Sequence, residues 1–252
     1  MQVSVLKRIL WCITGAGGSL REVFKLFINL RRKNPELDIG ILMSKAGMEV
    51  ARIYGIFDNL NLVATGGWYG GIYTEASVGG ITKEGIPLGG RVSLGRYNVI
   101  VIAPATSNTI AKIAHGISDT SPTLVSSQAL KSGVPLIILP ADNVEDAKTT
   151  LPCYIDTSKC IWCLVCVNSC PHGAIQITSS RTLAINYNLC RGCEKCAKLC
   201  QSKAIICWQE RKITVTPVDL ENLEKLRRIH GIRVATNCND IMKELKSILK
   251  LH

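Results

Sequence analysis

The sequence predicts an α/β protein in which a doubly wound parallel sheet carries a second, inserted α+β domain. Nearly uninterrupted apolar segments alternate with amphipathic segments of helical period over residues 8–140. This alternation stops near residue 151, where eight closely spaced cysteines follow, and it resumes after residue 210. Apolar strands separated by helices are typical of parallel sheets that are covered on both faces.

The chain opens with a strand, a tight turn and a helix. Residues 8–14 are predicted to form a buried strand, Gly15–Gly18 make a glycine-rich turn, and Ser19 is a candidate helix N-cap. Apolar residues then recur every three or four positions up to the basic end Arg31–Lys33, as in an amphipathic helix. The turn is either a phosphate site or only a tight turn, because its glycines match neither the dinucleotide motif nor the P-loop.

The next elements follow the same plan. We expect strands at 38–43, 97–103 and 134–139, with helices at 46–54 and 106–114 between them. Ligands of doubly wound sheets bind beyond the carboxyl ends of the strands. Small hydroxyl, amide and backbone groups that suit a phosphate and a flat heterocycle stand at three such ends, at Gly15–Gly17, Ser44 and Pro104–Thr109.

After residue 210 we expect a strand at 212–216, a helix at 219–228, a strand at 232–235 and a helix at 240–250. Either the cysteine-rich unit interrupts one α/β domain, or three consecutive units end in a small C-terminal appendage. We prefer the first interpretation, because a unit of about 40 residues makes a poor core by itself. The predicted domains are then 1–150, an insert at 151–210, and 211–252, which completes the first domain.

Eight of the twelve cysteines form two runs with the same spacing, C-x2-C-x2-C-x3-C. The runs begin at Cys160 and Cys190 and their flanks repeat too, which indicates an internal duplication. Three thiolates two residues apart wrap one face of a [4Fe–4S] cube, and in the two-cluster ferredoxin pattern the fourth ligand comes from the other run. The spacing predicts one cube on Cys160, Cys163, Cys166 and Cys200, and another on Cys190, Cys193, Cys196 and Cys170.

A pair of zinc knuckles is the alternative, but zinc sites take four ligands and rarely show two such runs of four. Residues 151–210 resemble bacterial two-cluster ferredoxins, with Gln201 where proline usually follows the last cysteine. In a reducing compartment we expect the remaining cysteines to be small buried side chains rather than disulfides. They are Cys12, Cys153, Cys207 and Cys238, of which Cys153 lies nearest to the cysteine runs.

Composition excludes several classes of protein. With 47% hydrophobic and 19% charged residues the chain can bury a core, so it is not disordered. No apolar run approaches the ~18 residues of a membrane-spanning helix, and no secretory signal stands at the N-terminus, which predicts a cytoplasmic protein with no membrane contact. The net charge of +11 is spread along the chain without a nucleic-acid motif, and it favours an anionic substrate or an acidic ferredoxin-like donor.

Three motifs point to a family. Thr14–Gly17, Ala103–Lys112 and Gly116–Asp119 resemble segments of the homo-oligomeric flavoproteins related to flavin-containing cysteine decarboxylases. Within that group the sequence is most similar to archaeal flavoproteins of the dihydromethanopterin reductase (acceptor) type, some of which carry two [4Fe–4S] clusters. The resemblance implies a Rossmann-like or flavodoxin-like flavoprotein fold, a trimer-based homo-oligomer, and FMN contacts from Gly15, Ala16, Gly17, Ser44, Thr106, Ser107, Asn108 and Thr109.

The chain departs from the decarboxylase branch of this family. That branch uses an earlier histidine and a later Pro-x-Met-Asn motif, whereas here no histidine precedes His115 and the later stretch reads Leu-Pro-Ala-Asp-Asn at 139–143. Cysteine decarboxylation is therefore not expected. His115 is expected to be a satisfied surface or core residue, and His172, next to the cysteine run, to tune a cluster by hydrogen bonding.

The glycine-rich stretch from Gly66 to Gly80 is longer than an ordinary connection. One interpretation is a flap over the flavin, with Trp68 or Tyr69 stacking on the substrate ring. The other is an oligomer contact or a disordered loop.

Together these features predict an iron–sulfur flavoprotein oxidoreductase. Iron–sulfur cubes pass single electrons, whereas reduction of a pterin C=N bond needs two electrons and two protons, and FMN converts between the two. The resemblance implies reduction of dihydromethanopterin to tetrahydromethanopterin, without indicating a catalytic residue. The alternative is an electron-transfer module that serves a partner protein and has no small-molecule substrate.

Overall fold

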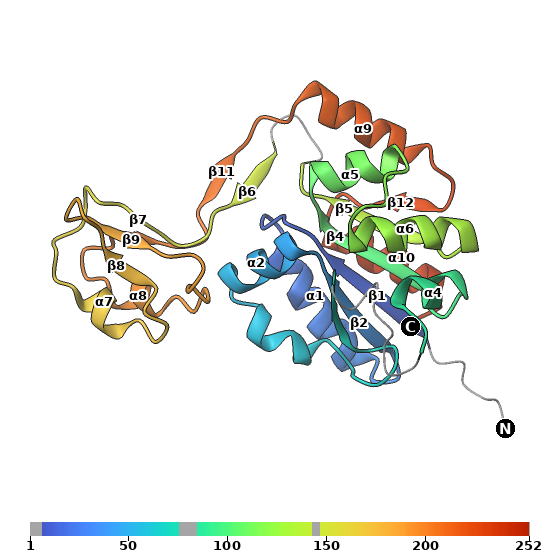
Figure 1. The fold of residues 1–252 in the computed structure, drawn as a ribbon, viewed down its shortest axis with the longest axis horizontal. Helices are drawn as coiled ribbons and strands as arrows, with labels where there is room; N and C mark the ends of the chain where they lie inside the picture. The colour runs from blue at the N-terminus through green and yellow to red at the C-terminus, as the bar shows by residue number, and fades with distance from the viewer. Residues whose placement is uncertain (1–6, 76–84, 143–146, 252) are drawn as a thin grey trace.

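The computed structural model describes residues 7–75, 85–142 and 147–251. Figure 1 shows a main body, in which helices cover both faces of a twisted sheet, and a small α+β unit that stands off one side. The sheet has six strands, in the order β12-β5-β4-β1-β2-β3, and every neighbouring pair is parallel. The predicted fold class, a doubly wound parallel sheet with a second smaller domain, is confirmed.

The strands form where the sequence is most continuously apolar. Every residue of β4 is buried, and so is every residue of β1 and β2 after the first, as expected for strands covered on both faces. The six strands are β1 (Arg8–Ile13), β2 (Asp38–Met43), β3 (Ile72–Thr74), β4 (Val99–Ala105), β5 (Leu136–Pro140) and β12 (Ile232–Val234).

Two cores lie on the two faces of the sheet. One face is covered by α1 (Leu20–Lys33), α2 (Lys45–Ile53), the 3-10 helix η1 (Phe57–Leu62) and α10 (Cys238–Leu249). The other is covered by α4 (Leu88–Ser93), α5 (Ser107–Ala114), α6 (Ser121–Ser132) and α9 (Pro217–Arg227). Trp11 anchors the first core, where its ring stacks on Phe27 at 4.6 Å and its indole N–H donates to the carbonyl of Ala103.

The strand expected at 212–216 is wrong. The strand is β11 (Glu210–Lys212), and it pairs antiparallel with β6 (Lys148–Thr150) in a two-stranded ribbon that connects the main body to the small unit (Figure 1). All three residues of β11 are exposed, so no apolar pattern marks it. Thr216 instead caps α9, where its hydroxyl and the carboxylate of Asp219 form a capping box.

The chain then returns to the main sheet. β12 lies beside β5 at the edge of the sheet, in parallel register from Ile232 opposite Leu136. α10 follows, and its apolar residues Ile241, Leu245 and Leu249 join the core beneath α1. The two ends of the small unit are therefore both attached to the main body.

The small unit shows the duplication directly. Its first half consists of β7 (Tyr154–Ile155), α7 (Val165–Ser169) and β8 (Ile175–Ile177), and its second of β9 (Leu183–Ile185), α8 (Lys195–Leu199) and β10 (Ile205–Ile206). β8 pairs with β9, and β7 pairs with β10, both antiparallel. Within the part of the chain that the structure describes, no helix is both long and apolar enough to cross a membrane.

Candidate functional site

One set of four cysteines lines a cavity inside the small unit. Cys190, Cys193 and Cys196 come from the second run, and Cys170, at the end of α7, comes from the first. Burial, and next the neighbouring thiols Cys190, Cys193 and Cys170, raise the pKa of Cys196 to about 11. The crossed ligand set expected from the spacing is therefore gathered around one space.

The other set gathers around the first loop. Cys166 is buried; this burial raises its pKa, and nearby Cys160 and Cys163 raise it further. Cys200, at the end of α8, packs on the small core that holds Cys160 and Cys166 and also Cys196 of the other set. We call the loop from Cys160 to Cys166 the outer loop and the loop from Cys190 to Cys196 the inner loop.

The donor chemistry suits iron–sulfur cubes. In each half a backbone N–H four residues on donates to the sulfur of the last cysteine, from Ala174 to Cys170 at 3.3 Å and from Ala204 to Cys200 at 3.2 Å. Such bonds favour the thiolate and tune a cluster. The four thiols of the inner-loop set line the wall of one cavity, which suits a cluster of several atoms.

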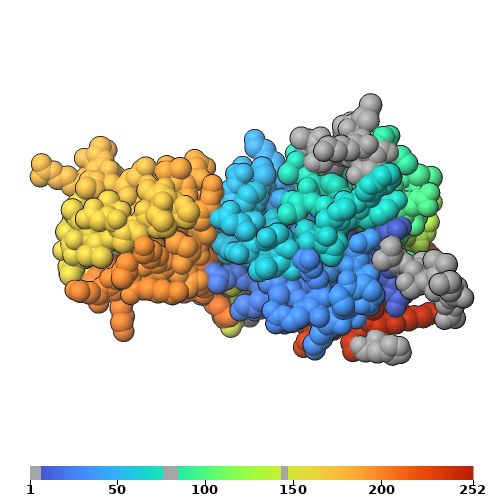
Figure 2. Space-filling view, turned by 90° about the horizontal axis from the view of Figure 1, so that it is seen from below, coloured from blue at the N-terminus to red at the C-terminus, as the bar shows by residue number. Residues whose placement is uncertain are grey.

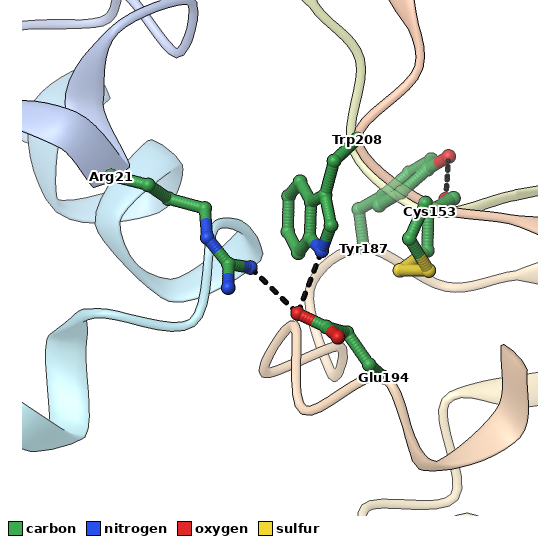
Figure 3. Close-up of a disulfide and its surroundings, with 6 residues drawn as sticks. Arg21, Cys153, Tyr187, Glu194 and Trp208 are labelled. Carbon is green, nitrogen blue, oxygen red and sulfur yellow. Dashed lines mark hydrogen bonds and ion pairs between the residues drawn. A yellow bond between two sulfur atoms is a disulfide. The ribbon is translucent and has the colours of Figure 1, made fainter. Parts of the chain in front are cut away.

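A disulfide corrects our expectation for the remaining cysteines. Cys153 and Cys207 are bonded to each other and lie beside the cavity of the inner loop (Figure 3). Antiparallel pairing of β7 with β10 sets Tyr154 opposite Ile206, so the two cysteines just beyond that pair also face each other. The Tyr187 hydroxyl donates to the Cys153 carbonyl at 2.9 Å and covers this end of the unit.

A second cavity, of about 580 Å³, lies at the carboxyl ends of β1, β2 and β4. This volume is ordinary for a cofactor site. Five of the eight residues predicted to contact FMN line it, namely Gly15, Ser44, Thr106, Asn108 and Thr109. The other three do not: Ala16 is buried, Gly17 packs against Tyr54, and the Ser107 hydroxyl donates to Asp142 at 2.8 Å.

Helix caps position the polar groups of this cavity. The Ser44 hydroxyl accepts from the backbone N–H of Gly47 at 3.0 Å, and the Thr106 hydroxyl accepts from that of Thr109 at 3.1 Å. These two N-caps start α2 and α5 at the cavity, so the positive ends of both helices point to it. A phosphate is the ligand that such an arrangement favours.

Sequence reasoning missed several residues of the cavity. Lys45, Glu49, Glu75 and Lys112 also line it. Lys45 and Glu49 are four positions apart on α2, a spacing that could have indicated them once Ser44 was chosen. Glu75 follows β3 and has no such local signal, and Lys112 forms an ion pair with Asp119 at 2.9 Å.

The flap hypothesis is wrong for the described part of the glycine-rich stretch. The ring of Tyr69 lies 3.9 Å from the guanidinium of Arg8, at the start of β1 and thus at the opposite end of the sheet from the cavity. Trp68 is 63% exposed, and neither ring lines the cavity. Gly79 and Gly80 lie outside the described residues.

His115 and His172, two of the four histidines, lie apart from the cavity at the strand ends. His115 caps the C-terminal end of α5, where its ring contacts the amide of Asn222 at 3.0 Å and the amine of Lys225 at 3.2 Å. It is a surface residue that links α5 to α9, as expected. His172 lines the inner-loop cavity.

A polar and aromatic cluster joins the inner loop to the main body (Figure 3). Arg21 of α1 forms an ion pair with Glu194 at 2.9 Å, and its guanidinium lies 4.1 Å from the ring of Trp208. The indole N–H of Trp208 donates to the same carboxylate at 2.7 Å. Partial burial alone would raise the pKa of Glu194, but these two donors outweigh it and hold the pKa below its usual value.

The cluster continues toward the flavin-type cavity. The rings of Trp208 and Tyr54 lie 5.4 Å apart, and a Cβ added to Gly17 would lie 2.1 Å from the Tyr54 ring. Gly17 belongs to the same turn as Gly15, which lines the cavity. Packed side chains therefore connect the inner loop with the glycine-rich turn, and Figure 2 shows the orange half of the small unit against the light-blue part of the main body.

Two glycines make the closest approach between the two bodies. A Cβ added to Gly192 of the inner loop would lie 2.4 Å from the carbonyl oxygen of Ile53, at the end of α2. A Cβ added to Gly55 would lie 2.8 Å from the carbonyl oxygen of Gly192. Only glycine permits this approach, because both Cβ positions are occupied by backbone atoms of the partner segment.

We expect Gly192→Ala to separate the two bodies. The added methyl overlaps the Ile53 carbonyl, and overpacking of this kind costs about 1–3 kcal/mol. Gly173→Ala is the matched control, because Gly173 has φ +58° against +57° for Gly192 but open space around its Cβ position. Limited proteolysis of the holoprotein at the β6–β11 ribbon should be faster in Gly192→Ala alone; equal rates in the two variants would show that the approach does not hold the bodies together.

The comparisons agree with this architecture. The flavoprotein family matches residues 2–150, and the 4Fe-4S dicluster domain matches residues 159–204. The dihydromethanopterin reductase (acceptor) of Methanosarcina mazei is 35% identical over 239 residues, covering 94% of this chain and 98% of the relative. The enzyme of the same name from Methanocaldococcus jannaschii is 38% identical over 237 residues, covering 94% of each chain.

Solved structures share the fold. DmrB of Burkholderia xenovorans, described in complex with FMN as a cubic protein cage for redox transfer, superposes with a TM-score of 0.60 at 22% identity, over 98% of this chain and 99% of its own. A dodecameric FMN-dependent Ubix-like decarboxylase of Escherichia coli O157:H7 superposes with a TM-score of 0.51 at 14% identity, over 97% and 95%. From its sequence relatives, the chain is an iron–sulfur flavoprotein and belongs to the family of the dihydromethanopterin reductases (acceptor).

Proposed function

We propose that this protein reduces dihydromethanopterin to tetrahydromethanopterin, using bound FMN, two [4Fe–4S] clusters and a one-electron donor. The observation that carries the proposal is the packed connection from the inner loop, through Trp208 and Tyr54, to the glycine-rich turn of the cavity. A one-electron centre and a flavin site that are connected by packed side chains suit a reductase that collects single electrons. Relatives that match nearly the whole chain carry the name of this activity.

The cavity offers the groups that FMN needs. The hydroxyls of Ser44, Thr106 and Thr109 and the first N–H groups of α2 and α5 suit its phosphate. Asn108 carries both a donor and an acceptor to the cavity, which suits the edge of a flat heterocycle. When bound, FMN supplies the conversion of single electrons into the pair that the pterin takes up with two protons.

The cavity wall carries charges of both signs. Lys45 and Lys112 stand there together with Glu49 and Glu75, and Lys112 is paired with Asp119. The net charge of +11, which two all-cysteine cubes lower to roughly +7, still gives a positive field that favours the approach of anions. An anionic pterin is therefore attracted by the charge of the whole molecule rather than by the cavity wall.

We also propose a cytoplasmic, trimer-based homo-oligomer. The dodecameric Escherichia coli decarboxylase and the caged DmrB are assemblies with this fold, by their own descriptions. Light scattering at micromolar concentration should give a mass that is a multiple of three chains of 27.5 kDa, and a monomer mass would refute the assembly. Cell fractionation tests the compartment.

The test of the function is reduction of dihydromethanopterin by the anaerobically reconstituted protein with a chemical reductant. We expect one tetrahydromethanopterin for each two electrons supplied, at a rate proportional to enzyme, and iron and sulfide contents approaching eight of each per chain, as two cubes require. Protein that carries flavin and iron but leaves dihydromethanopterin unchanged would contradict the proposal.

A further inference from the structure

The outer and inner loops are copies of one sequence that have come to differ at their exposed positions. Ile161, Trp162, Leu164 and Val165 of the outer loop correspond to Arg191, Gly192, Glu194 and Lys195 of the inner loop. Their backbones remain alike, with φ +58° at Trp162 against +57° at Gly192, and +58° at Leu164 against +62° at Glu194. The differences therefore concern what each loop faces, not how it folds.

Contact with the main body explains which residues the inner loop has. Gly192 leaves room for the Ile53 carbonyl, and Glu194 receives Arg21 and Trp208. The corresponding outer-loop residues face no such surface: α7 and the loop before it lie at the end of the small unit away from the main body (Figure 1).

The fold does not explain why a tryptophan stands at position 162. Its left-handed backbone favours glycine and is unusual for a bulky side chain, and the duplicate position has glycine. The Trp162 side chain is nevertheless 43% exposed, and its neighbours Ile161 and Val165 are 63% and 39% exposed. We call these three residues the outer-loop patch. An exposed apolar group of this kind that includes a tryptophan is typical of a binding surface.

We propose that the outer-loop patch is the docking surface for a small acidic one-electron carrier protein of the ferredoxin class. Lys159 and Lys203 flank it, directly before Cys160 and three residues after Cys200, and both are exposed. The one carboxylate between Tyr154 and Pro171, Asp156, is held by Lys159 at 3.0 Å. With two lysines against one carboxylate, the surroundings of this apolar centre keep a net positive charge, which matches a carrier whose carboxylates surround its exposed cluster.

The chemistry requires a carrier rather than a permanent partner. This inference rests on the proposed function only in that the chain accepts single electrons. Each docked carrier gives up one electron and leaves in its oxidised form, so two carriers supply the pair that one pterin reduction consumes. A small patch suits this exchange, because transient redox encounters use small interfaces.

The test compares Trp162→Gly with Trp68→Gly in the holoprotein. Trp162→Gly restores the residue of the duplicate loop, so it should leave folding, flavin and iron unchanged. Calorimetric titration with an oxidised bacterial-type ferredoxin should show a Kd raised at least about tenfold, since buried tryptophans carry much of the energy of an interface. Trp68, which is 63% exposed and lies outside the small unit, controls for loss of an exposed indole.

Kinetics supply a second readout that needs no pterin. Bleaching of the flavin absorbance by reduced ferredoxin should slow by the same factor in Trp162→Gly, while bleaching by dithionite should keep its rate. Lys203→Glu should weaken ferredoxin binding most at low salt. Wild-type affinity in Trp162→Gly, or equal losses in both tryptophan variants, would overturn the docking surface, whereas failure to reduce dihydromethanopterin would contradict only the proposed function.

Discussion

The Cys193→Ala protein is expected to bind flavin normally but to lose reduction by a one-electron ferredoxin. Cys193 shares the inner-loop cavity with Cys170, Cys190 and Cys196, so its removal leaves three of the four thiolates of one predicted cube. Changes to groups that merely support a metal ligand cost about 10–100-fold, so loss of a ligand should reduce the rate with ferredoxin by about 100-fold or more. Stopped-flow absorbance measures that rate.

Flavin retention separates this effect from unfolding. The residues proposed to contact FMN come from the main body, and a direct two-electron chemical donor should still reduce the flavin of the variant. Cys238→Ala is the matched control, because Cys238 is a half-buried thiol at the start of α10 and belongs to neither run. If Cys193→Ala accepted electrons from ferredoxin at the wild-type rate, the inner cube would be structural or regulatory.

The second large effect that we expect is a loss of FMN affinity in Asn108→Leu. Asn108 is the second residue of α5 and lines the cavity, and the variant replaces its donor and acceptor with an apolar group. A polar partner left without its hydrogen bond costs about 1–3 kcal/mol, which corresponds to a Kd raised between about fivefold and about 150-fold. Fluorescence titration of the apoprotein with FMN measures it, with iron content unchanged.

The same substitution at Asn239 is the control. Asn239 is also exposed, and it is also the second residue of a helix that starts from a side-chain N-cap, that of α10. It lies outside the residues that line the cavity, so Asn239→Leu should keep the wild-type Kd. Equal FMN affinity in both variants would remove Asn108 from the flavin site.

Elements with a strong local period could be predicted from the sequence within a residue or two. α1 ends at Lys33 and β2 covers Asp38–Met43, as expected, because the buried positions of α1 recur every three or four residues and β2 is an almost continuous apolar run. β6 and β11 could not be predicted in this way. Their exposed and half-buried residues pair with each other across the 60-residue insert, and nothing in either segment alone shows that pairing.

What the sequence by itself determined is the cysteine spacing, the internal duplication and the polar groups at three strand ends, because each is written within a few consecutive residues. What only the tertiary structure decided is which distant residues meet. The pairing of Cys153 with Cys207 crosses 54 residues, and Arg21 reaches Glu194 from another domain. Such contacts depend on the register of the strands and on how the two bodies pack. A packed interface produces no periodic pattern in the sequence of either segment.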